Sequence, residues 1–394
     1  MESAPIYLDH AATTPLDPRV VDAMCDCLRD PALQGNPAST HAPGRMAAAR
    51  VEIARAQVAR LIGAPPESIV FTSGATESVS LAILGAARAA GTGLRHVVTS
   101  VIEHRCGIDA CRQLEREGFK VSWLKPGADG RIDPELVAGA MRPDTALVSV
   151  MHANNETGVQ NDIQQIGRLC RDRGVTFHVD AAQSAGKLPV DVGEIGVALL
   201  SYCAHKLGGP KGVGALYVQR RPRPALQPLQ FGGGQEGGLR AGTLPTHQLV
   251  GFGVACELAR TLLSRESPRI RTLRERLWAG LQPAAPVARN GAAEPSVPGI
   301  LNVRFPGIEG ESLLLALDGR LAVSSGSACS AASAEPSHVL RALGLSDLAA
   351  QASLRLSLGR QTTEGEIDRA ARLLVDCVRR LRGALPAGAV ERIA

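Results

Sequence analysis

Short runs of apolar residues alternate along the chain with longer segments in which apolar residues recur every three or four positions. In residues 44–62, for example, Val51, Ala54, Val58 and Leu61 fall on one face of a helix. A short apolar run between two such segments is typical of a strand buried in a parallel sheet. Repeated alternation favours right-handed crossovers and a mostly parallel α/β sheet. The pattern predicts strands at residues 69–71, 96–102, 121–124, 146–150, 175–179, 197–200 and 213–218, and helices at 44–62, 78–90, 107–118 and 163–173, with another helix opened by Asp133-Pro134.

The pattern changes after residue 218. Residues 231–243 contain too many glycines for the interior of a helix or strand, and they have no evident partner within their own domain. A long helical region at 247–281 follows. Thr363 and Glu366 then form the capping-box pattern that opens a final helix. Between these helices the chain reads as a smaller α/β unit, with strands at 300–305, 321–323 and 353–357 and helices at 310–317 and 336–343.

A chain of 394 residues is long for a single domain, so we expect two domains, each with its own core. The large domain is predicted to span residues 15–255 and the small C-terminal domain residues 256–394. Residues 1–14 contain a short strand and a turn. Aromatic residues make up only 3% of the chain, so Ala, Leu and Val must fill both cores.

Composition restricts the classes of function. The net charge of +5 is small for this length and does not favour nucleic-acid binding, and the basic run at 220–224 reads as a solvated loop. We expect no membrane association, because no apolar stretch approaches the ~20 residues of a membrane helix, and residues 1–5 do not resemble a secretory signal. The nine cysteines show no zinc-finger spacing, and Cys25 and Cys27 would diverge on a helix, so no metal site is predicted. An odd number of cysteines in a long chain fits a reducing cytoplasm.

Charged side chains follow two neighbouring predicted strands. Asp180 comes directly after the strand at 175–179, and His205 and Lys206 follow the strand at 197–200. Open α/β sheets place their ligand sites at such strand ends. A lysine and a carboxylate there suit pyridoxal 5′-phosphate, because the lysine can form the Schiff base and the carboxylate can hold the pyridine nitrogen protonated. An ordinary salt bridge with a surface lysine remains an equal alternative on these two residues alone.

Three other segments carry candidate polar groups. The turn at residues 72–77 opens the helix at 78–90, where backbone N–H groups would attract a phosphate. The same turn would also serve as a helix cap without a ligand. His104 lies at a strand end, where a lone histidine is usually structural, and Asn154 and Asn155 form a pair of amides of the kind that stabilises turns.

Three sequence motifs resemble those of the cysteine desulfurases, which are class V aminotransferases of fold type I that depend on pyridoxal 5′-phosphate. They are residues 178–184 (HVDAAQS), residues 204–212 (AHKLGGPKG) and residues 324–329 (SSGSAC). The resemblance extends from residue 7 to residue 360, with its motifs in the family's order. It implies a large domain with a sheet of the seven-stranded type, a smaller domain that carries a cysteine loop, and an N-terminal segment that crosses the mouth of the active site.

The resemblance also implies roles for individual residues. Lys206 would carry the cofactor and move a proton at the substrate α-carbon, while Asp180 would hold the pyridine nitrogen and His104 would stack on the ring. Asn155 and Gln183 match residues beside the phenolic oxygen. Arg355 and Asn155 match the groups that bind the substrate carboxylate. The phosphate would be held by Ala75, Thr76, Cys203 and His205, and by Thr243 from the partner subunit of a homodimer.

Cys329 matches the nucleophile that takes sulfur from L-cysteine, which leaves L-alanine and a persulfide on the enzyme. The long loop at 324–337 resembles the group of desulfurases that pass sulfur directly to an acceptor protein, either a scaffold or a sulfur carrier. The resemblance therefore implies a cytoplasmic homodimer that supplies sulfur for iron–sulfur clusters, thio-cofactors or tRNA. It also allows Cys329 to touch a nascent iron–sulfur cluster, although no resident metal is predicted.

Some positions depart from the family pattern. Val79 and Ser80 replace a more polar pair, Gly237 stands where arginine is common, and Cys203 replaces a serine, so that a weak thiol donor faces the phosphate. Two alternatives stay open: the first because Cys329 does not exclude selenocysteine as substrate, and the second because of these departures. One is a selenocysteine lyase or another class V enzyme, and the other is a non-catalytic relative that acts as a protein-binding scaffold. The tail at 382–394 lacks the acidic, aromatic end that we associate with docking of the iron–sulfur scaffold, so the acceptor is not predicted.

Overall fold

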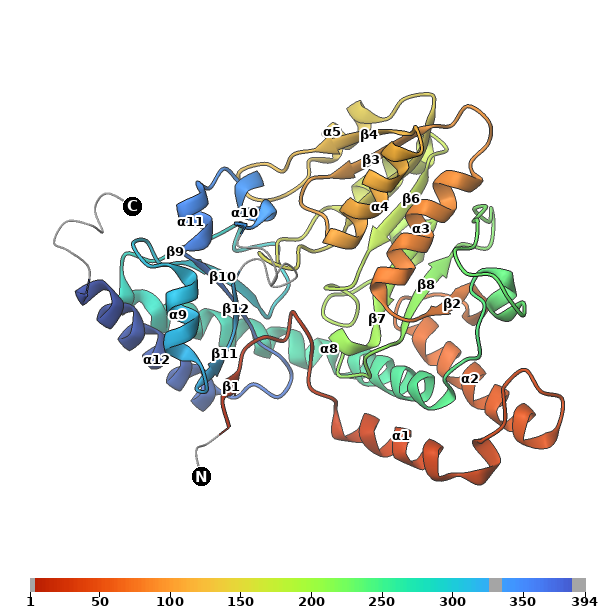
Figure 1. Ribbon diagram of the computed structural model, residues 1–394, viewed down its shortest axis with the longest axis horizontal. Coiled ribbons are helices and arrows are strands. Elements are labelled where there is room, and N and C mark those ends of the chain that lie inside the picture. Colours follow the sequence, from red (N-terminus) through yellow and green to blue (C-terminus); the bar gives the residue numbers. More distant parts are fainter. Residues whose placement is uncertain (1–3, 326–334, 385–394) are drawn as a thin grey trace.

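The computed structural model describes residues 4–325 and 335–384 of the chain, and its larger part is built on a seven-stranded sheet (Figure 1). Every strand predicted for this part is present. In chain order the strands are β2 (Ile69–Thr72), β3 (His96–Ser100), β4 (Lys120–Leu124), β5 (Thr145–Met151), β6 (Thr176–Asp180), β7 (Leu199–Cys203) and β8 (Gly214–Val218). Their order across the sheet is β2-β8-β7-β6-β5-β3-β4.

The predicted mostly parallel sheet is confirmed. Strands β3 to β7 pair in parallel, each with its spatial neighbours among them. Strand β8 runs antiparallel to both β7 and β2. The reason is the connection from β7 to β8, residues 204–213, which is too short for the crossover that a parallel neighbour needs.

Helices cover both faces of this sheet because successive strand residues point to opposite sides. Phe177, Leu200 and Tyr202 pack on one face with α2 (Ala42–Arg60) and α6 (Ile163–Asp172), whereas Leu199 and Leu216 pack on the other face. The second face is covered by α3 (Ala75–Ala89) and α4 (Arg105–Arg116). The remaining helices of this part are α1 (Pro18–Arg29), α5 (Pro134–Ala140) and α7 (Val192–Ile195).

The smaller part contains a four-stranded antiparallel sheet in the order β12-β13-β10-β9. Its strands are β9 (Ala288–Arg289), β10 (Ile300–Arg304), β12 (Ser324–Ser325) and β13 (Ser353–Ser357). Near the start of the chain, β1 (Ile6–Tyr7) pairs in parallel with β11 (Leu321–Ala322). The capping box of Thr363 and Glu366 opens α12 (Glu364–Gly383) as predicted. The other helices of this part are α9 (Gly310–Leu317), α10 (His338–Ala342) and α11 (Asp347–Gln351).

One long helix, α8 (Thr246–Leu281), runs from the large part of the molecule to the small one (Figure 1). Residues such as Leu249 and Phe252 pack into the core under the large sheet. Leu273 and Leu277 pack into the core of the small part, where Leu8 of the N-terminal segment also lies. The proposed domain boundary at 255/256 falls inside this helix. Among the described residues, no helix is both long enough and apolar enough to cross a membrane.

Candidate active site

A cavity of about 560 Å³ opens at the ends of β5, β6 and β7, where parallel strands place their ligand sites. Segments of the chain that lie far apart in the sequence line it: the start of α3, the start of α4, β13, and the N-terminal residues 11–13. The cavity brings together Ala75, Thr76, His104, Asn155, Asp180, Gln183, Cys203, His205, Lys206 and Arg355. Ten of the residues predicted from the sequence therefore share one cavity.

The start of α3 faces this cavity. The helix begins at Ala75, three residues earlier than predicted, so Ala75 and Thr76 lie in its first turn. Its N-cap is Gly74, and no side chain caps the helix. Gly214 of β8 packs against this point, because a Cβ atom there would lie 2.7 Å from the Gly74 Cα. An uncapped helix start of this kind, fixed by close packing, suits an anion.

Asp180 ends β6 and is 7% exposed. One of its carboxylate oxygens accepts the Ala182 N–H at 2.9 Å. Burial raises the pKa of Asp180, and the nearby His104 and Lys206 act in the opposite direction. A desolvated carboxylate of this kind is stabilised by a cation that approaches it from the cavity.

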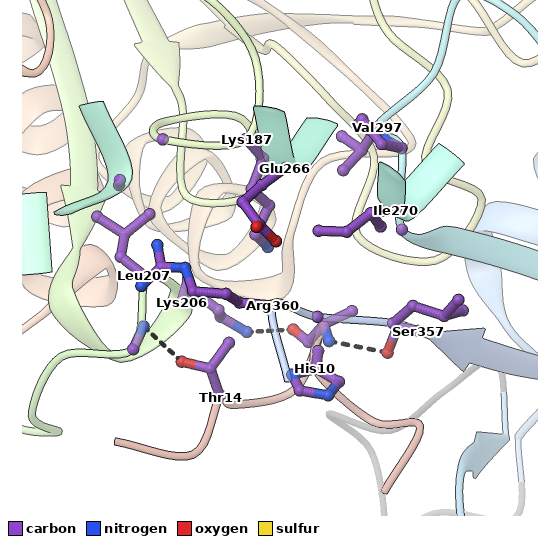
Figure 2. Close-up of a pocket in the computed structure, with 18 of the residues that line it drawn as sticks. His10, Thr14, Lys187, Lys206, Leu207, Glu266, Ile270, Val297, Ser357 and Arg360 are labelled. Carbon is purple, nitrogen blue, oxygen red and sulfur yellow. Dashed lines mark hydrogen bonds between the residues drawn. The ribbon is translucent and has the colours of Figure 1, made fainter. Parts of the chain in front are cut away.

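Lys206 is held by the N-terminal segment. Its Nζ atom donates hydrogen bonds to the Ala11 carbonyl and, at 2.7 Å, to the Ala12 carbonyl. The Thr14 hydroxyl donates to the His205 carbonyl at 2.8 Å. It also accepts the Gly208 N–H at 2.7 Å (Figure 2). These contacts place the N-terminal segment across the lysine-bearing turn, next to the cavity.

His104 is the N-cap of α4. Its Nδ1 atom accepts the Cys106 N–H at 3.3 Å and lies 3.0 Å from the Cys106 Sγ.

Asn154 and Asn155, in the turn that follows β5, make different contacts. The Asn154 side chain holds the turn, since its Oδ1 accepts the N–H groups of residues 156 and 157 at 2.9 and 3.0 Å. Asn155 lines the cavity, and its carbonyl accepts Arg355 Nη1 at 3.0 Å.

Arg355 projects from the middle of β13 and is 2% exposed. Its Nη2 pairs with the Asp9 carboxylate at 2.9 Å, and its Nε has no hydrogen-bond partner among the described residues. Asp9 also accepts the Ser324 hydroxyl at 2.9 Å. A buried guanidinium with one free donor can take a carboxylate ligand in its planar fork. The sequence reasoning did not predict the Asp9 partner, although the resemblance begins at the segment that contains it.

Cys203 and Gln183 occupy deeper positions in the cavity wall. Burial raises the pKa of Cys203 to about 11, so the group that replaces the family's serine is a neutral thiol at pH 7. The Gln183 amide nitrogen donates to the Ala11 carbonyl at 2.8 Å, and its amide oxygen accepts Lys187 Nζ at 3.0 Å. Lys187 is a second residue that the sequence reasoning missed. The one feature of the sequence that could have indicated its contact with Gln183 is its position four residues further along the chain.

The glycine-rich loop at 231–243 corrects one sequence-based expectation, because it does have partners within its own domain. Glu236 forms a bidentate pair with Arg55 at 2.8 and 2.7 Å and accepts the Phe71 N–H at 2.7 Å. Arg240 pairs with Glu77 in the first turn of α3 at 2.9 Å. Thr243, at the end of the loop, is exposed and does not line the cavity.

Cys329, the predicted nucleophile, lies outside the described residues. The described residues on either side, Ser324 and Ser337, are both anchored: Ser324 donates to Asp9, and Ser337 donates to the buried carboxylate of Glu156 at 2.5 Å. Within residues 4–325 and 335–384, no cluster of three or more His, Cys, Asp or Glu side chains is arranged to hold a metal ion.

Comparison with known proteins places this cavity in context. The class V aminotransferase family model matches residues 6–370. The chain is 54% identical to cysteine desulfurase IscS of Enterobacter sp. (strain 638) over 383 residues, which cover 97% of this chain and 95% of that protein. It is 56% identical to cysteine desulfurase IscS of Aeromonas hydrophila subsp. hydrophila over 384 residues, with the same coverage of 97% and 95%.

Two solved structures share the fold over most of the chain. A NifS-like protein aligns with a TM-score of 0.89 at 34% identity, over 95% of this chain and 100% of that one. The structure of SspA in complex with cysteine aligns with a TM-score of 0.79 at 38% identity, over 89% of this chain and 98% of that one.

Proposed function

This chain belongs to the cysteine desulfurases of the class V aminotransferase family, whose cofactor is pyridoxal 5′-phosphate, and we propose how its own residues convert L-cysteine to L-alanine. The proposal is carried by one observation: a single cavity collects ten of the residues that the sequence motifs select. These residues come from strand ends, helix starts and the small sheet, so their convergence is a property of the fold.

The cavity fits the cofactor in three respects. The uncapped start of α3, with Ala75 and Thr76, suits the phosphate, and His205 lies on the same cavity wall. The buried carboxylate of Asp180 suits a protonated pyridine nitrogen. Lys206 and Lys211 both line the cavity, and Lys206 is the one that the sequence motif assigns to the cofactor aldehyde. When bound, the cofactor supplies an electron sink that makes the substrate α-hydrogen acidic.

The protein's own groups then bind the substrate and move its protons. Arg355 and Asn155 orient the L-cysteine carboxylate, with Arg355 exchanging part of its contact with Asp9 for the substrate. Lys206 takes the proton from the α-carbon and later returns one there. His104 lines the cavity, where it would stack on the cofactor ring and supply a second proton-transfer group.

Cys329 removes the sulfur. Its thiolate attacks the substrate γ-sulfur, so a bond forms between the two sulfur atoms while the bond from sulfur to the β-carbon breaks. The β-carbon takes up the electron pair and a proton, which yields alanine. The enzyme retains the sulfur as a persulfide on Cys329. Ser324 and Ser337, which flank this loop, are fixed by carboxylates near the cavity and support its placement there.

The assembly and the destination of the sulfur are also part of the proposal. We place the enzyme in the cytoplasm as a homodimer in which Thr243 contacts the partner's cofactor phosphate. The exposure of Thr243 outside its own cavity supports this arrangement, as does the anchoring of its loop to the start of α3 through Arg240. A sulfur-acceptor protein takes the persulfide sulfur from Cys329 for iron–sulfur clusters, thio-cofactors or tRNA.

The test uses the purified protein loaded with pyridoxal 5′-phosphate. Wild type given L-cysteine without reductant should release alanine and gain sulfur mass on the peptide that contains Cys329. Cys329→Ser should keep the cofactor absorbance and lose alanine production, whereas Lys206→Ala should lose both. Cys25→Ser is the matched control, because Cys25 lies on α1 away from the cavity. Full activity of Cys329→Ser on cysteine, or sulfur found mainly on Cys106 or Cys203, would contradict the proposal.

A further inference from the structure

A second cavity, of about 90 Å³, adjoins the active-site cavity and is lined by His10 and Thr14 of the N-terminal segment, by Lys187 and by Lys206 (Figure 2). Ala11 and Lys206 line both cavities. Gln183 lines the active-site cavity, and Lys187 lines the second one. The hydrogen bond from Lys187 Nζ to Gln183 Oε1, at 3.0 Å, therefore crosses the wall between the two cavities.

The local backbone explains why Lys187 reaches Gln183 from behind. After β6 the chain makes two tight turns, in which the Ala185 N–H donates to the Ala181 carbonyl and the Leu188 N–H to the Ser184 carbonyl, both at 2.9 Å. This winding brings Lys187 back to Gln183, where Lys187 Nζ donates to Gln183 Oε1. Gly186 permits it, because its φ is +70° and a Cβ there would lie 2.7 Å from Leu207 Cδ2.

Two neighbours of opposite chemistry determine how the Gln183 amide is turned. The protonated form of Lys187 can only donate a hydrogen bond, and the Ala11 carbonyl can only accept one. The amide oxygen therefore faces Lys187, and the amide nitrogen faces Ala11 at 2.8 Å. Gln183 is 5% exposed, so a reversed amide would bury two mismatched contacts.

We propose that Lys187 is a positioning residue: it fixes the Gln183 amide so that the second N–H of the amide nitrogen donates to the phenolic oxygen of the cofactor. This inference rests on the proposed function, which places Gln183 beside that oxygen. Lys187 itself touches neither cofactor nor substrate. It acts from the second cavity through one hydrogen bond.

The electrostatic surroundings of Lys187 agree with this role. Burial lowers the pKa of Lys187 to about 7, and the positive charges of Lys206 and Arg355 act in the same direction. Donation to Gln183 Oε1 is one of the interactions that keep a proton on this amine. The charged and titratable side chains that share the wall of the second cavity with Lys187 are His10, Asp17, Lys206, Glu266 and Arg360.

The test is a pH titration of the absorbance of the bound cofactor. The phenolic oxygen shares a proton with the lysine nitrogen. When the oxygen loses a hydrogen-bond donor, its affinity for this proton increases, and the pKa of the shared proton rises. Lys187→Met should therefore raise the titration midpoint by about one pH unit, a roughly tenfold change in proton affinity. Gln183→Met should shift it in the same direction. Lys125→Met, an exposed lysine outside both cavities, should leave the midpoint unchanged.

The double variant distinguishes an effect of Lys187 that passes through Gln183 from a direct effect of the Lys187 charge on Lys206. If Lys187 acts through Gln183, adding Lys187→Met to Gln183→Met gives no further shift. Additive shifts in the double variant would mean that the Lys187 charge acts directly on Lys206, and they would overturn the proposal. An unchanged or absent titration midpoint in Lys187→Met would also overturn it. Lys187→Gln, which keeps an amide donor, replaces Lys187→Met if that variant does not fold, and it should shift the midpoint less than Gln183→Met does. A wild type that binds no cofactor would instead contradict the proposed function.

Discussion

Replacing Glu236 with glutamine removes the negative charge from the buried ion pair that ties the loop at 231–243 to the large sheet. The Glu236 side chain is 2% exposed and that of Arg55 is 11% exposed. Arg55 also donates to the Ile69 carbonyl at 2.9 Å and lies over the Phe71 ring. The substitution therefore leaves a guanidinium that is fixed in place without its main counter-charge.

The magnitude follows from burial and from the contacts that remain. Removing one partner of a buried ion pair costs about 3–5 kcal/mol. Glutamine keeps the shape of Glu236 and can still accept the Phe71 N–H, and Glu52 remains 3.1 Å from Arg55 with a side chain that is 62% exposed. We therefore expect the lower end of that range, a loss of about 3 kcal/mol in the free energy of unfolding.

Urea denaturation followed by circular dichroism measures this loss. Glu67→Gln is the matched control, because Glu67 pairs with Arg220 at 3.0 Å while both side chains are more than half exposed. Removing the charge of an exposed pair should cost less than about 1 kcal/mol. Equal shifts of the first unfolding transition in Glu236→Gln and Glu67→Gln would refute the reasoning that burial sets the energy of the pair.

Three other predictions concern the active site and its surroundings. Arg355→Ala should raise the KM for L-cysteine at least about tenfold and leave the cofactor absorbance intact, and an unchanged KM would remove Arg355 from the carboxylate site. Burial raises the pKa of Glu156 from 4.5 to about 7. Between these values the folded protein holds a proton that the unfolded chain has lost, so this residue makes stability fall as the pH rises. Glu156→Gln should therefore lose less stability than wild type between about pH 5 and 8 in urea, and parallel curves would contradict this. Mixing Lys206→Ala with Thr243→Ala protomers should restore partial activity, because each hybrid dimer has one intact site, whereas a monomer in sedimentation would exclude shared sites.

The sequence predicted the strands of the large part and most of the residues that line the cavity. Asp180, His205 and Lys206 follow adjacent parallel strands, and such strands end at one edge of the sheet, so proximity in space followed from the order of the elements. Helix α1 was not predicted, although Asp17 and Pro18 carry its signals, a cap side chain and a proline at the first helical position. Val20, Met24 and Cys27 also recur at helical spacing, so the sequence did carry a periodic signal for this helix.

Contacts that depend on long loops and on domain packing could not be predicted in the same way. Asp9 and Arg355 are 346 residues apart, and Glu236 and Arg55 are 181 residues apart, so neither pair leaves a local pattern. The separation of Gln183 and Lys187 is local, but the direction of the amide depends on the Ala11 carbonyl, which the N-terminal segment brings from the start of the chain.

The sequence by itself therefore determined which residue types reach the sheet edge, because strand and helix periods and turn residues are local properties of the chain. It determined the start of α12 as well, since a capping box needs only neighbouring residues. Only the tertiary structure decided which buried charge faces which partner. Those pairings form when separate elements pack and exclude water, and their energies depend on the burial that packing creates.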